Sequence, residues 1–220
     1  MPGYVLSLMG EAMPGPKERP LDAPAGEVEC LVIDNQHHGH PRPQAKLRVA
    51  KNGKTYRNAM KSTKKISVLF VCMGNICRSP TAEAVARTLA LRRGLEAHFE
   101  FDSAGTHGYH VGQAPDRRAQ EAAAKRGYDL SKLRARQVDA RDFVRFDRIL
   151  AMDRDNLALL RQACPVEHHG KLGLFLEYAS EKTLDEVPDP YYGGPEGFET
   201  VLDLIEEGAH GLIERLAPRD

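Results

Sequence analysis

Cys72 and Arg78 are the first residues whose types and spacing could perform chemistry, because five residues separate a nucleophile from a cation. The backbone N–H groups of a glycine-containing loop can point inward and bind an anion. The planar guanidinium of Arg78 suits two phosphate oxygens, and cationic surroundings stabilise the thiolate, the nucleophilic form of Cys72. The pattern therefore predicts a phosphate-binding loop, although a cysteine at a strand end is more often only a small buried side chain.

The residues between and just after this pair have matching properties. The hydroxyl of Ser79 can donate a hydrogen bond to the thiolate, Gly74 leaves space for a ligand, and Asn75 tolerates a left-handed backbone and can brace the loop. A second thiol, that of Cys77, lies in the same loop. The predicted ligand-binding residues of the loop are Met73, Gly74, Asn75, Ile76, Cys77 and Ser79.

A second segment offers a proton donor. Asp189 lies between Pro188 and Pro190 and is followed by Tyr191 and Tyr192. Transfer of a phosphoryl group to sulfur needs a proton for the leaving oxygen, and a positioned carboxylic acid is a common donor. We therefore expect Asp189 to be the general acid and the two tyrosines to flank an aromatic leaving group. The alternative is an ordinary turn in which Asp189 caps the next helix.

The elements around the loop would place it where ligands bind in α/β proteins. Residues 66–71 form a short apolar, β-branched run, which is typical of a strand buried on both faces of a parallel sheet. Ser79 is predicted to be the N-cap of the following helix, with Pro80 at its first position and Gly94 at its end. Cys72 would then lie at the carboxyl end of the strand, where open parallel sheets bind their ligands.

Strands and helices continue to alternate after this point, which indicates an α/β fold with a parallel sheet. A continuous apolar stripe at helical spacing makes the last helix the clearest prediction. The remaining predicted strands are residues 99–105, 148–152 and 171–176, and the remaining predicted helices are residues 116–126, 156–162 and 198–216.

The chain has 220 residues, and its composition separates an N-terminal extension from a domain. Its charge and hydropathy also limit the classes of partner that it is expected to bind. Residues 1–64 are rich in proline and are predicted to be a disordered or loosely packed extension, whereas residues 65–220 form the domain. The 31 basic residues equal the 31 acidic ones, so net charge gives no argument for nucleic acid. No apolar run approaches the roughly 20 residues of a membrane-spanning helix, and no secretory signal is evident. We expect no membrane association and a cytoplasmic location.

No metal site is expected. His37, His38 and His40 form one cluster, and His168 and His169 form another. Neither cluster has matching cysteine or acidic partners, which a protein site for zinc or a similar ion requires. We interpret both clusters as solvated loop histidines.

Taken together, the two functional segments resemble the low-molecular-weight protein tyrosine phosphatases. The resemblance covers about residues 65–217, and its most specific parts are the loop around Cys72 and the loop around Asp189. The segments that carry it are residues 68–83, 103–106, 135–137, 152–157 and 189–193.

The resemblance implies a three-layer fold, in which helices flank a four-stranded parallel sheet and the phosphate-binding loop follows the first strand. It implies that Cys72 attacks phosphotyrosine to form a phosphocysteine, that Arg78 holds the phosphate, and that Asp189 is first acid and then base, without cofactor or metal. The implied partner is a tyrosine-phosphorylated protein, for example a bacterial tyrosine kinase, and we expect a monomer or weak dimer. In many members the second loop cysteine, here Cys77, forms a reversible disulfide with the nucleophile.

Three alternative functions and one difference from the pattern of the family stay open. A thiol-dependent arsenate reductase on the same fold would need further relay cysteines, for which Cys164 alone is a poor candidate. A protein-arginine phosphatase typically has threonine at the position of Ile76, whose bulk suits a phenyl ring better than a guanidinium. A non-catalytic phosphate-binding or redox-sensing module would not need Asp189. Some members brace the loop asparagine with a histidine, which residues 131–134 lack, so the partner of Asn75 is not evident.

Overall fold

The structure, a computed structural model, divides into two units between residues 58 and 59. In the N-terminal unit, β1 (Arg48–Val49) and β2 (Thr55–Tyr56) form a two-stranded antiparallel sheet. The rest of the predicted extension 1–64, and with it the predicted disorder, lies outside the described residues. The structure describes residues 48–49, 55–56, 65–181, 184–192 and 194–218.

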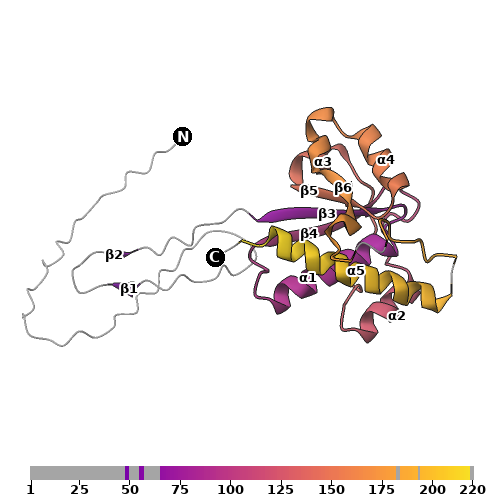
Figure 1. The fold of residues 1–220 in the computed structure, drawn as a ribbon, viewed down its shortest axis with the longest axis horizontal. Coiled ribbons are helices and arrows are strands. Elements are labelled where there is room, and N and C mark those ends of the chain that lie inside the picture. The colour runs from indigo at the N-terminus through magenta and orange to yellow at the C-terminus, as the bar shows by residue number, and fades with distance from the viewer. Residues whose placement is uncertain (1–47, 50–54, 57–64, 182–183, 193, 219–220) are drawn as a thin grey trace, which may run out of the picture. The chain divides into compact units, whose positions relative to one another are not determined.

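A four-stranded parallel sheet forms the centre of the C-terminal unit (Figure 1). Its spatial order is β4-β3-β5-β6, and Cys72 pairs with Gly105 at the carboxyl edge. The predicted α/β fold and parallel sheet are thereby confirmed, although the last strand is shorter than predicted because the chain turns into a 3₁₀ helix at Phe175. The strands are β3 (Ile66–Cys72), β4 (Phe99–Gly105), β5 (Arg148–Ala151) and β6 (Leu172–Leu174).

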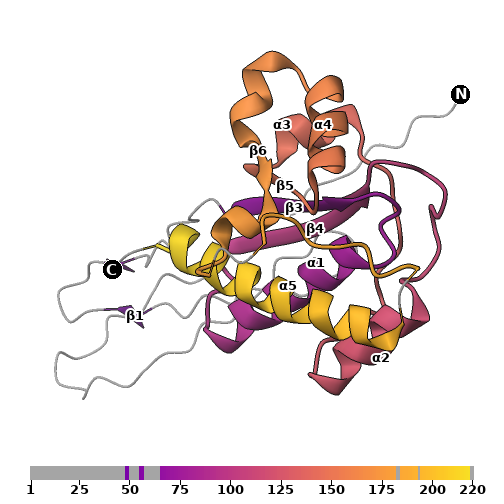
Figure 2. The same ribbon diagram turned by 45° about the vertical axis from the view of Figure 1, so that its right-hand side comes forward.

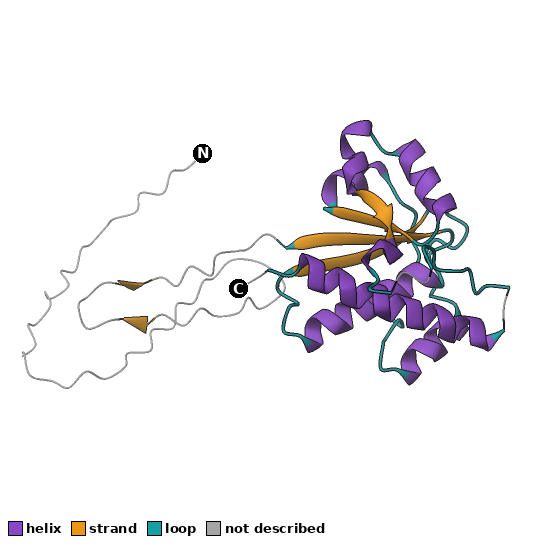
Figure 3. Ribbon diagram, viewed as in Figure 1, coloured by secondary structure: helices purple, strands orange, loops and turns teal. Residues whose placement is uncertain are grey.

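Helices cover both faces of the sheet and complete the three layers (Figures 2 and 3). The α-helices are α1 (Arg78–Arg92), α2 (Arg117–Lys125), α3 (Ala140–Arg145), α4 (Arg154–Ala163) and α5 (Pro195–Leu216), and the 3₁₀ helices are η1 (Val166–Lys171) and η2 (Phe175–Tyr178). Residues Val68 and Phe70 of β3 belong to the apolar cluster with α1, α2 and α5, whereas Leu69 and Val71 belong to the cluster with α3 and α4. Among the described residues, no helix is both long and apolar enough to cross a bilayer.

β3 is the two-faced buried strand that its apolar run predicts. Its residues from Val68 to Val71 have no exposed surface. The ring of Phe70 packs edge-on against Phe175, with centroids 5.3 Å apart, and is stacked 6.1 Å from Phe101. Full burial of each such side chain contributes about 1.5–3 kcal/mol to the free energy of unfolding. The packing of β3 therefore fixes the position of Cys72, where the loop begins.

The predicted start of the first helix is wrong by two residues. α1 begins at Arg78, its N-cap is Cys77, and no side chain forms a capping hydrogen bond there. Ser79 lies inside the first turn, because its hydroxyl is used within the loop rather than on the helix end. Pro80 still lies in the first turn, where a backbone N–H has no partner within the helix and its absence costs little.

The ends of the other predicted helices lie within three residues of the structure: α2 is one residue shorter at each end, α4 begins two residues earlier, and α5 begins three residues earlier. Gly94 and Gly127 follow α1 and α2 with φ angles of 68° and 80°, a conformation that favours glycine. The side chain of Asp153 caps α4 by accepting a hydrogen bond from the backbone of Asn156. The sequence did not predict α3, a single short helix that Asp139 starts with a capping box.

Candidate active site

The nucleophile candidate, Cys72, lies at the bottom of a loop at the carboxyl edge of the sheet. Its side chain is buried, with 3% of the residue exposed. The sulfur lies 3.1 Å from the hydroxyl oxygen of Ser79 and accepts a hydrogen bond from the backbone N–H of Asn75 at 3.3 Å. The N–H of Asn75 is a donor suited to a negative sulfur. In the pair with Ser79 either atom can be the donor, since the Ser79 hydroxyl also lies 3.2 Å from the carbonyl oxygen of Ala104.

Asn75 holds the loop in its shape. Its φ of 55° is the one left-handed value among the described residues other than glycine. The side-chain amide donates to the hydroxyls of Ser79 at 2.9 Å and of Ser103 at 3.0 Å, and its carbonyl oxygen accepts from the backbone N–H of Arg136 at 2.9 Å. The partners of Asn75, which were not evident from the sequence, are therefore two serines and a backbone amide.

Behind this brace, a buried carboxyl continues the hydrogen-bond network into α1. The hydroxyl of Ser103 donates to Glu83 at 2.7 Å, and Arg87 pairs with the other carboxyl oxygen of Glu83. Burial raises the pKa of Glu83, and the bonds from Ser103 and Arg87 oppose that rise. Glu83 and Ser103 lie in segments 68–83 and 103–106, but their residue types alone did not indicate a role for either. A glutamate within the run of small and apolar residues that follows Pro80 was the signal that could have identified the first.

Two glycines allow other chain segments to approach the loop. A β-carbon on Gly74 would lie 3.0 Å from the ring of His110, so this glycine leaves space for a side chain of the protein itself, in addition to any ligand. A β-carbon on Gly105 would lie 2.7 Å from the carbonyl oxygen of Met73 and 3.0 Å from that of His107. The sequence did not identify Gly105 or His110 as neighbours of the site.

Arg78 is buried and connects the loop with two carboxylates. Its guanidinium donates to Asp153 at 2.6 Å and to Asp189 at 2.8 Å, and also to the carbonyl oxygen of Val187 at 3.2 Å. Burial acts to lower the pKa of Arg78, but the negative charges of Cys72, Asp189 and Asp153 outweigh burial and raise it. Arg78 therefore keeps its charge. The contact of Asp153 with Arg78 was not evident from the sequence, because the two residues lie 75 positions apart.

Asp189, 111 positions from Arg78 in the chain, comes to the site on a loop anchored at β5. The backbone N–H of Val187 donates to the carbonyl oxygen of Met152 at 2.8 Å, and the Val187 side chain is fully buried. The Asp189 side chain is 43% exposed, and its second oxygen accepts from the backbone N–H of Tyr191 at 3.0 Å. The N-cap of α5 is Gly194, so the alternative in which Asp189 caps this helix is wrong.

The two tyrosines lie at the rim beside this acid. Tyr191 is 41% exposed and Tyr192 is 96% exposed. Their rings are 5.1 Å apart and nearly perpendicular, at 86°. Both rings therefore offer apolar surface to a group that approaches Asp189 from solvent. Met73, 49% exposed, adds a further apolar side chain to the surface of the loop, whereas Ile76 is partly buried.

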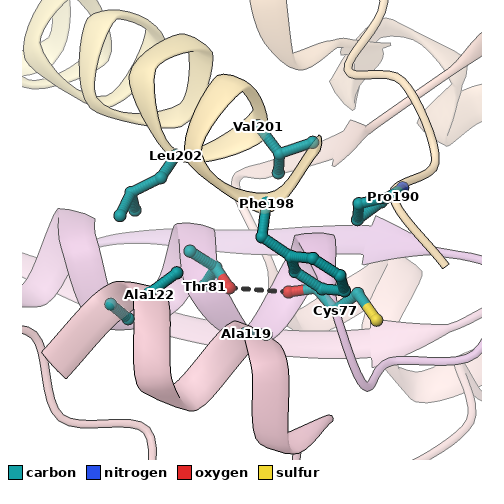
Figure 4. Close-up of a pocket in the computed structure, with 9 residues that line it drawn as sticks. Cys77, Thr81, Ala119, Ala122, Pro190, Phe198, Val201 and Leu202 are labelled. Atoms are coloured by element: carbon teal, nitrogen blue, oxygen red, sulfur yellow. Dashed lines mark hydrogen bonds between the residues drawn. The ribbon is translucent and has the colours of Figure 1, made fainter. Parts of the chain in front are cut away.

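Cys77, the second loop thiol, is buried beside the loop that carries Asp189 (residues 187–192, the acid loop). It lines a cavity of about 10 Å³ between α1, α2 and α5, together with Pro190 and Phe198 (Figure 4). Burial, together with the nearby charge of Asp116, raises the pKa of Cys77 to about 12. Cys77 is therefore a neutral thiol near neutral pH, and within the described residues all cysteines are free.

The described residues contain no group of three or more histidine, cysteine or acidic side chains that could hold a metal ion. His168 and His169 lie in η1, a short 3₁₀ helix, rather than in the open loop that the sequence predicts. The cluster around His37 lies outside the described residues. Near Cys72 the positive charge that the structure describes is that of Arg78, together with the backbone N–H of Asn75.

The chain is similar to known phosphatases over the region that contains this site. A family model described as low molecular weight phosphotyrosine protein phosphatase matches residues 67–219. The low molecular weight phosphotyrosine protein phosphatase of Schizosaccharomyces pombe is 50% identical over 156 residues, which are 70% of this chain and 99% of that protein. The low molecular weight protein-tyrosine-phosphatase YfkJ of Bacillus subtilis is 44% identical over 148 residues, with 67% and 94% covered.

Solved structures agree with this relationship. The crystal structure of YfkJ matches with a TM-score of 0.66 and 42% identity, and covers 70% of this chain and 98% of its own. A crystal structure of a protein tyrosine phosphatase from Entamoeba histolytica, with Hepes in its active site, matches with a TM-score of 0.67 and 41% identity, and covers 69% and 97%.

These relatives favour the tyrosine phosphatase over the three alternatives that the sequence left open, since each of them is named as a tyrosine phosphatase. The match of the family model spans more than half of the chain, and it includes the loop at Cys72 and the loop at Asp189. The chain belongs to the low molecular weight phosphotyrosine protein phosphatase family and is a protein-tyrosine phosphatase.

Proposed function

We propose that Cys72 is the nucleophile of a two-step hydrolysis of phosphotyrosine. Its thiolate attacks phosphorus in line, the bond from phosphorus to the phenolic oxygen breaks, and a phosphocysteine forms. Arg78 and the inward N–H groups of the loop hold the remaining phosphate oxygens. Asp189 gives its proton to the departing phenolic oxygen.

Asp189 then acts in the reverse direction. As a carboxylate it takes a proton from a water molecule, whose oxygen attacks phosphorus while the phosphorus–sulfur bond breaks. The products are inorganic phosphate and the thiolate of Cys72, which the hydroxyl of Ser79 stabilises at 3.1 Å. The carboxyl has therefore returned to its protonated form, and the enzyme is ready for the next cycle.

One contact supports this assignment more than any other: the pair between Arg78 and Asp189 at 2.8 Å. It places the acid beside the group that would hold the phosphate. When a phosphate dianion occupies Arg78, Asp189 loses this partner and gains a negative neighbour, which favours its protonated form. Substrate binding would thereby prepare the acid for the first step.

Rapid denaturation in alkaline detergent during turnover of a radiolabelled phosphotyrosyl peptide tests the mechanism. We expect label bound to the protein through a phosphorus–sulfur bond at Cys72, with EDTA present throughout. The variant Cys72→Ser should bind the peptide without retaining label after denaturation. Turnover without a labelled protein intermediate, under conditions that trap other phosphocysteines, would contradict the two-step reaction.

The pH dependence of kcat/KM should show a maximum at mildly acidic pH. The thiolate of Cys72 and the protonated form of Asp189 must coexist, so the rate falls in acid as the thiolate is protonated and in alkali as Asp189 loses its proton. Phenyl phosphate is a suitable substrate, because its leaving group needs the acid. A rate that rises steadily up to about pH 9 would contradict the role of Asp189 as a proton donor.

The substrate is a phosphotyrosine of a protein, and the exposed part of Ile76, within the loop, would offer a branched apolar side chain to its phenyl ring. That a bacterial tyrosine kinase is the physiological substrate is a proposal that rests on the resemblance alone. Phosphoproteomics of a cell that expresses the Cys72→Ser variant would test it, because a trapped substrate accumulates in the phosphorylated form. The monomeric or weakly dimeric state and the cytoplasmic location stay predictions.

Deleting residues 1–64 should leave kcat/KM unchanged within about two-fold. The first strand of the catalytic sheet begins at Ile66 and the family match begins at residue 67, so the active-site residues all follow the deletion. Kinetics with p-nitrophenyl phosphate and thermal unfolding of both forms would measure the effect. Loss of folding on deletion would show that the extension is part of the domain.

Redox control through Cys77 also stays a prediction. Peroxide would convert the Cys72 thiolate to a sulfenic acid, and the sulfur of Cys77 would then displace water to give a disulfide. Because burial raises the pKa of Cys77 to about 12, Cys77 would have to lose its proton during this attack. The first oxidation is therefore expected at Cys72 and not at Cys77.

A further inference from the structure

We propose that Arg118 is a positioning residue that connects the phosphate-binding loop with the acid loop and holds Asp189 in place for proton transfer. This inference rests on the roles proposed above for Cys72 and Asp189. Arg118 lies in the first turn of α2, does not contact Cys72 or Arg78 in any described hydrogen bond, and was not singled out by the sequence.

The first part of the connection fixes Arg118 to the phosphate-binding loop. The backbone N–H of Asp116 donates to the carbonyl oxygen of Ile76 at 2.7 Å, so the start of α2 is attached to the loop. The carboxylate of Asp116 accepts from Arg118 at both oxygens, from Nε at 3.1 Å and from Nη2 at 2.9 Å. Such a two-point pair fixes the plane of the guanidinium as well as its position.

The second part joins Arg118 to the acid loop. The remaining nitrogen, Nη1, donates to the carbonyl oxygen of Tyr191 at 3.0 Å. The guanidinium carbon lies 4.7 Å from the ring centre of Phe198 and 5.5 Å from that of Tyr191, distances at which a cation is attracted to an aromatic face. One side chain thus contacts the acid loop through a backbone oxygen and a ring, and α5 through another ring.

Tyr191 carries this restraint to the acid. Its backbone N–H donates to Oδ1 of Asp189 at 3.0 Å, while its carbonyl oxygen is held by Arg118. The other oxygen of Asp189 contacts Arg78, a contact that the phosphate of the substrate would replace. Once substrate is bound, Tyr191 and the anchor at Val187 are the described contacts that remain on either side of Asp189. Arg118 therefore matters most at the moment when the acid must act.

A purely structural role for Arg118, in which it only packs α2 against α5, predicts a different result from a positioning role. A misplaced general acid slows substrates with poor leaving groups and spares those with good ones, whereas loosened packing slows both alike. Misplacement of a catalytic group by about 1 Å costs on the order of 100-fold in rate. The dependence of kcat/KM on the leaving group therefore separates the two roles.

The test compares Arg118→Ala and Arg118→Lys with the wild type on phenyl phosphate and p-nitrophenyl phosphate. For Arg118→Ala we expect kcat/KM to fall roughly 10- to 100-fold on phenyl phosphate and less than about three-fold on p-nitrophenyl phosphate. Arg118→Lys keeps the positive charge but lacks the planar guanidinium with its several N–H donors, so its loss of kcat/KM on phenyl phosphate should be intermediate. The matched control is Arg117→Ala, since Arg117 is its exposed neighbour, pairs only with Glu121 among its described contacts, and should show neither loss.

A double variant completes the test. In an Asp189→Asn background, Arg118→Ala should have no further effect on phenyl phosphate, because the acid that Arg118 positions is absent. Equal losses on both substrates, or the same loss with and without Asp189, would overturn the proposal while leaving the two-step mechanism intact. If Arg118→Ala does not fold, Arg118→Lys gives the same comparison. Failure of the mechanism itself would appear separately, as a wild type without a labelled phosphocysteine.

Discussion

Replacing Cys72 by serine should abolish turnover, with a loss of kcat of at least about 10⁴-fold. The serine hydroxyl fits the space of the thiol, but it is scarcely ionised near neutral pH and is a far weaker nucleophile. Ser79 and the N–H of Asn75, which lie 3.1 Å and 3.3 Å from the sulfur, remain in place. Because Arg78 and the loop amides are unchanged, we expect the variant to bind inorganic phosphate or tungstate with an affinity close to that of the wild type, measured by calorimetry.

Cys164→Ser is the matched control for this variant. Cys164 is also a buried free thiol, but it lies at the end of α4, where its sulfur donates to the carbonyl oxygen of Pro165. Its replacement should leave kcat within about two-fold of the wild type, because a structural cysteine contributes packing and no chemistry. Substantial turnover by Cys72→Ser, with Cys164→Ser unaffected, would show that the nucleophile lies elsewhere.

Replacing Asp189 by asparagine should lower kcat/KM on phenyl phosphate roughly 10²- to 10³-fold, because the leaving phenolate then departs without a proton. The loss on a substrate with a good leaving group should be much smaller. Asparagine can still accept the hydrogen bond from the backbone N–H of Tyr191, which the aspartate accepts at 3.0 Å. We therefore expect the conformation of the acid loop to be unchanged. Wild-type rates on the poor leaving group would show that another group donates the proton.

The same variant should bind inorganic phosphate more tightly than the wild type. In the wild type the carboxylate of Asp189 occupies one nitrogen of Arg78 at 2.8 Å, and an incoming anion has to replace it. A neutral amide competes less strongly. Asp185→Asn is the control, since Asp185 lies shortly before the acid loop and pairs with Arg154 rather than Arg78. Its affinity for phosphate and its rate should match those of the wild type.

The parts of the site that the sequence predicted are those encoded by neighbouring residues. The apolar run before Cys72 indicated a strand buried on both faces, and the spacing to Arg78 indicated the loop, because both patterns are local. Reasoning from neighbouring residues also gave the wrong first residue for α1. Ser79 has the type of residue that caps helices, but in the structure its hydroxyl contacts the sulfur of Cys72.

The parts that the sequence missed depend on residues brought together by folding. The brace of Asn75 comes from Ser103 on β4 and from a backbone amide at Arg136, and no residue type marks a backbone donor in advance. The attachment of the acid loop through Arg118 joins segments 73 positions apart. α3 was missed because a helix of six residues shows too few turns to reveal a period.

The ion pair between Arg78 and Asp189 also bears on the release of the product, inorganic phosphate. Inorganic phosphate is a dianion near neutral pH and fits the same loop as the substrate, so a loop built only for affinity would stay occupied after each turnover. In the mechanism proposed above, Asp189 holds a proton at the end of each turnover; once it has lost that proton, its carboxylate can take the position on Arg78 that phosphate vacates, where the structure has the pair at 2.8 Å. Because this anion is part of the chain, its local concentration does not fall with dilution, and it competes with phosphate for Arg78 at any concentration of the enzyme.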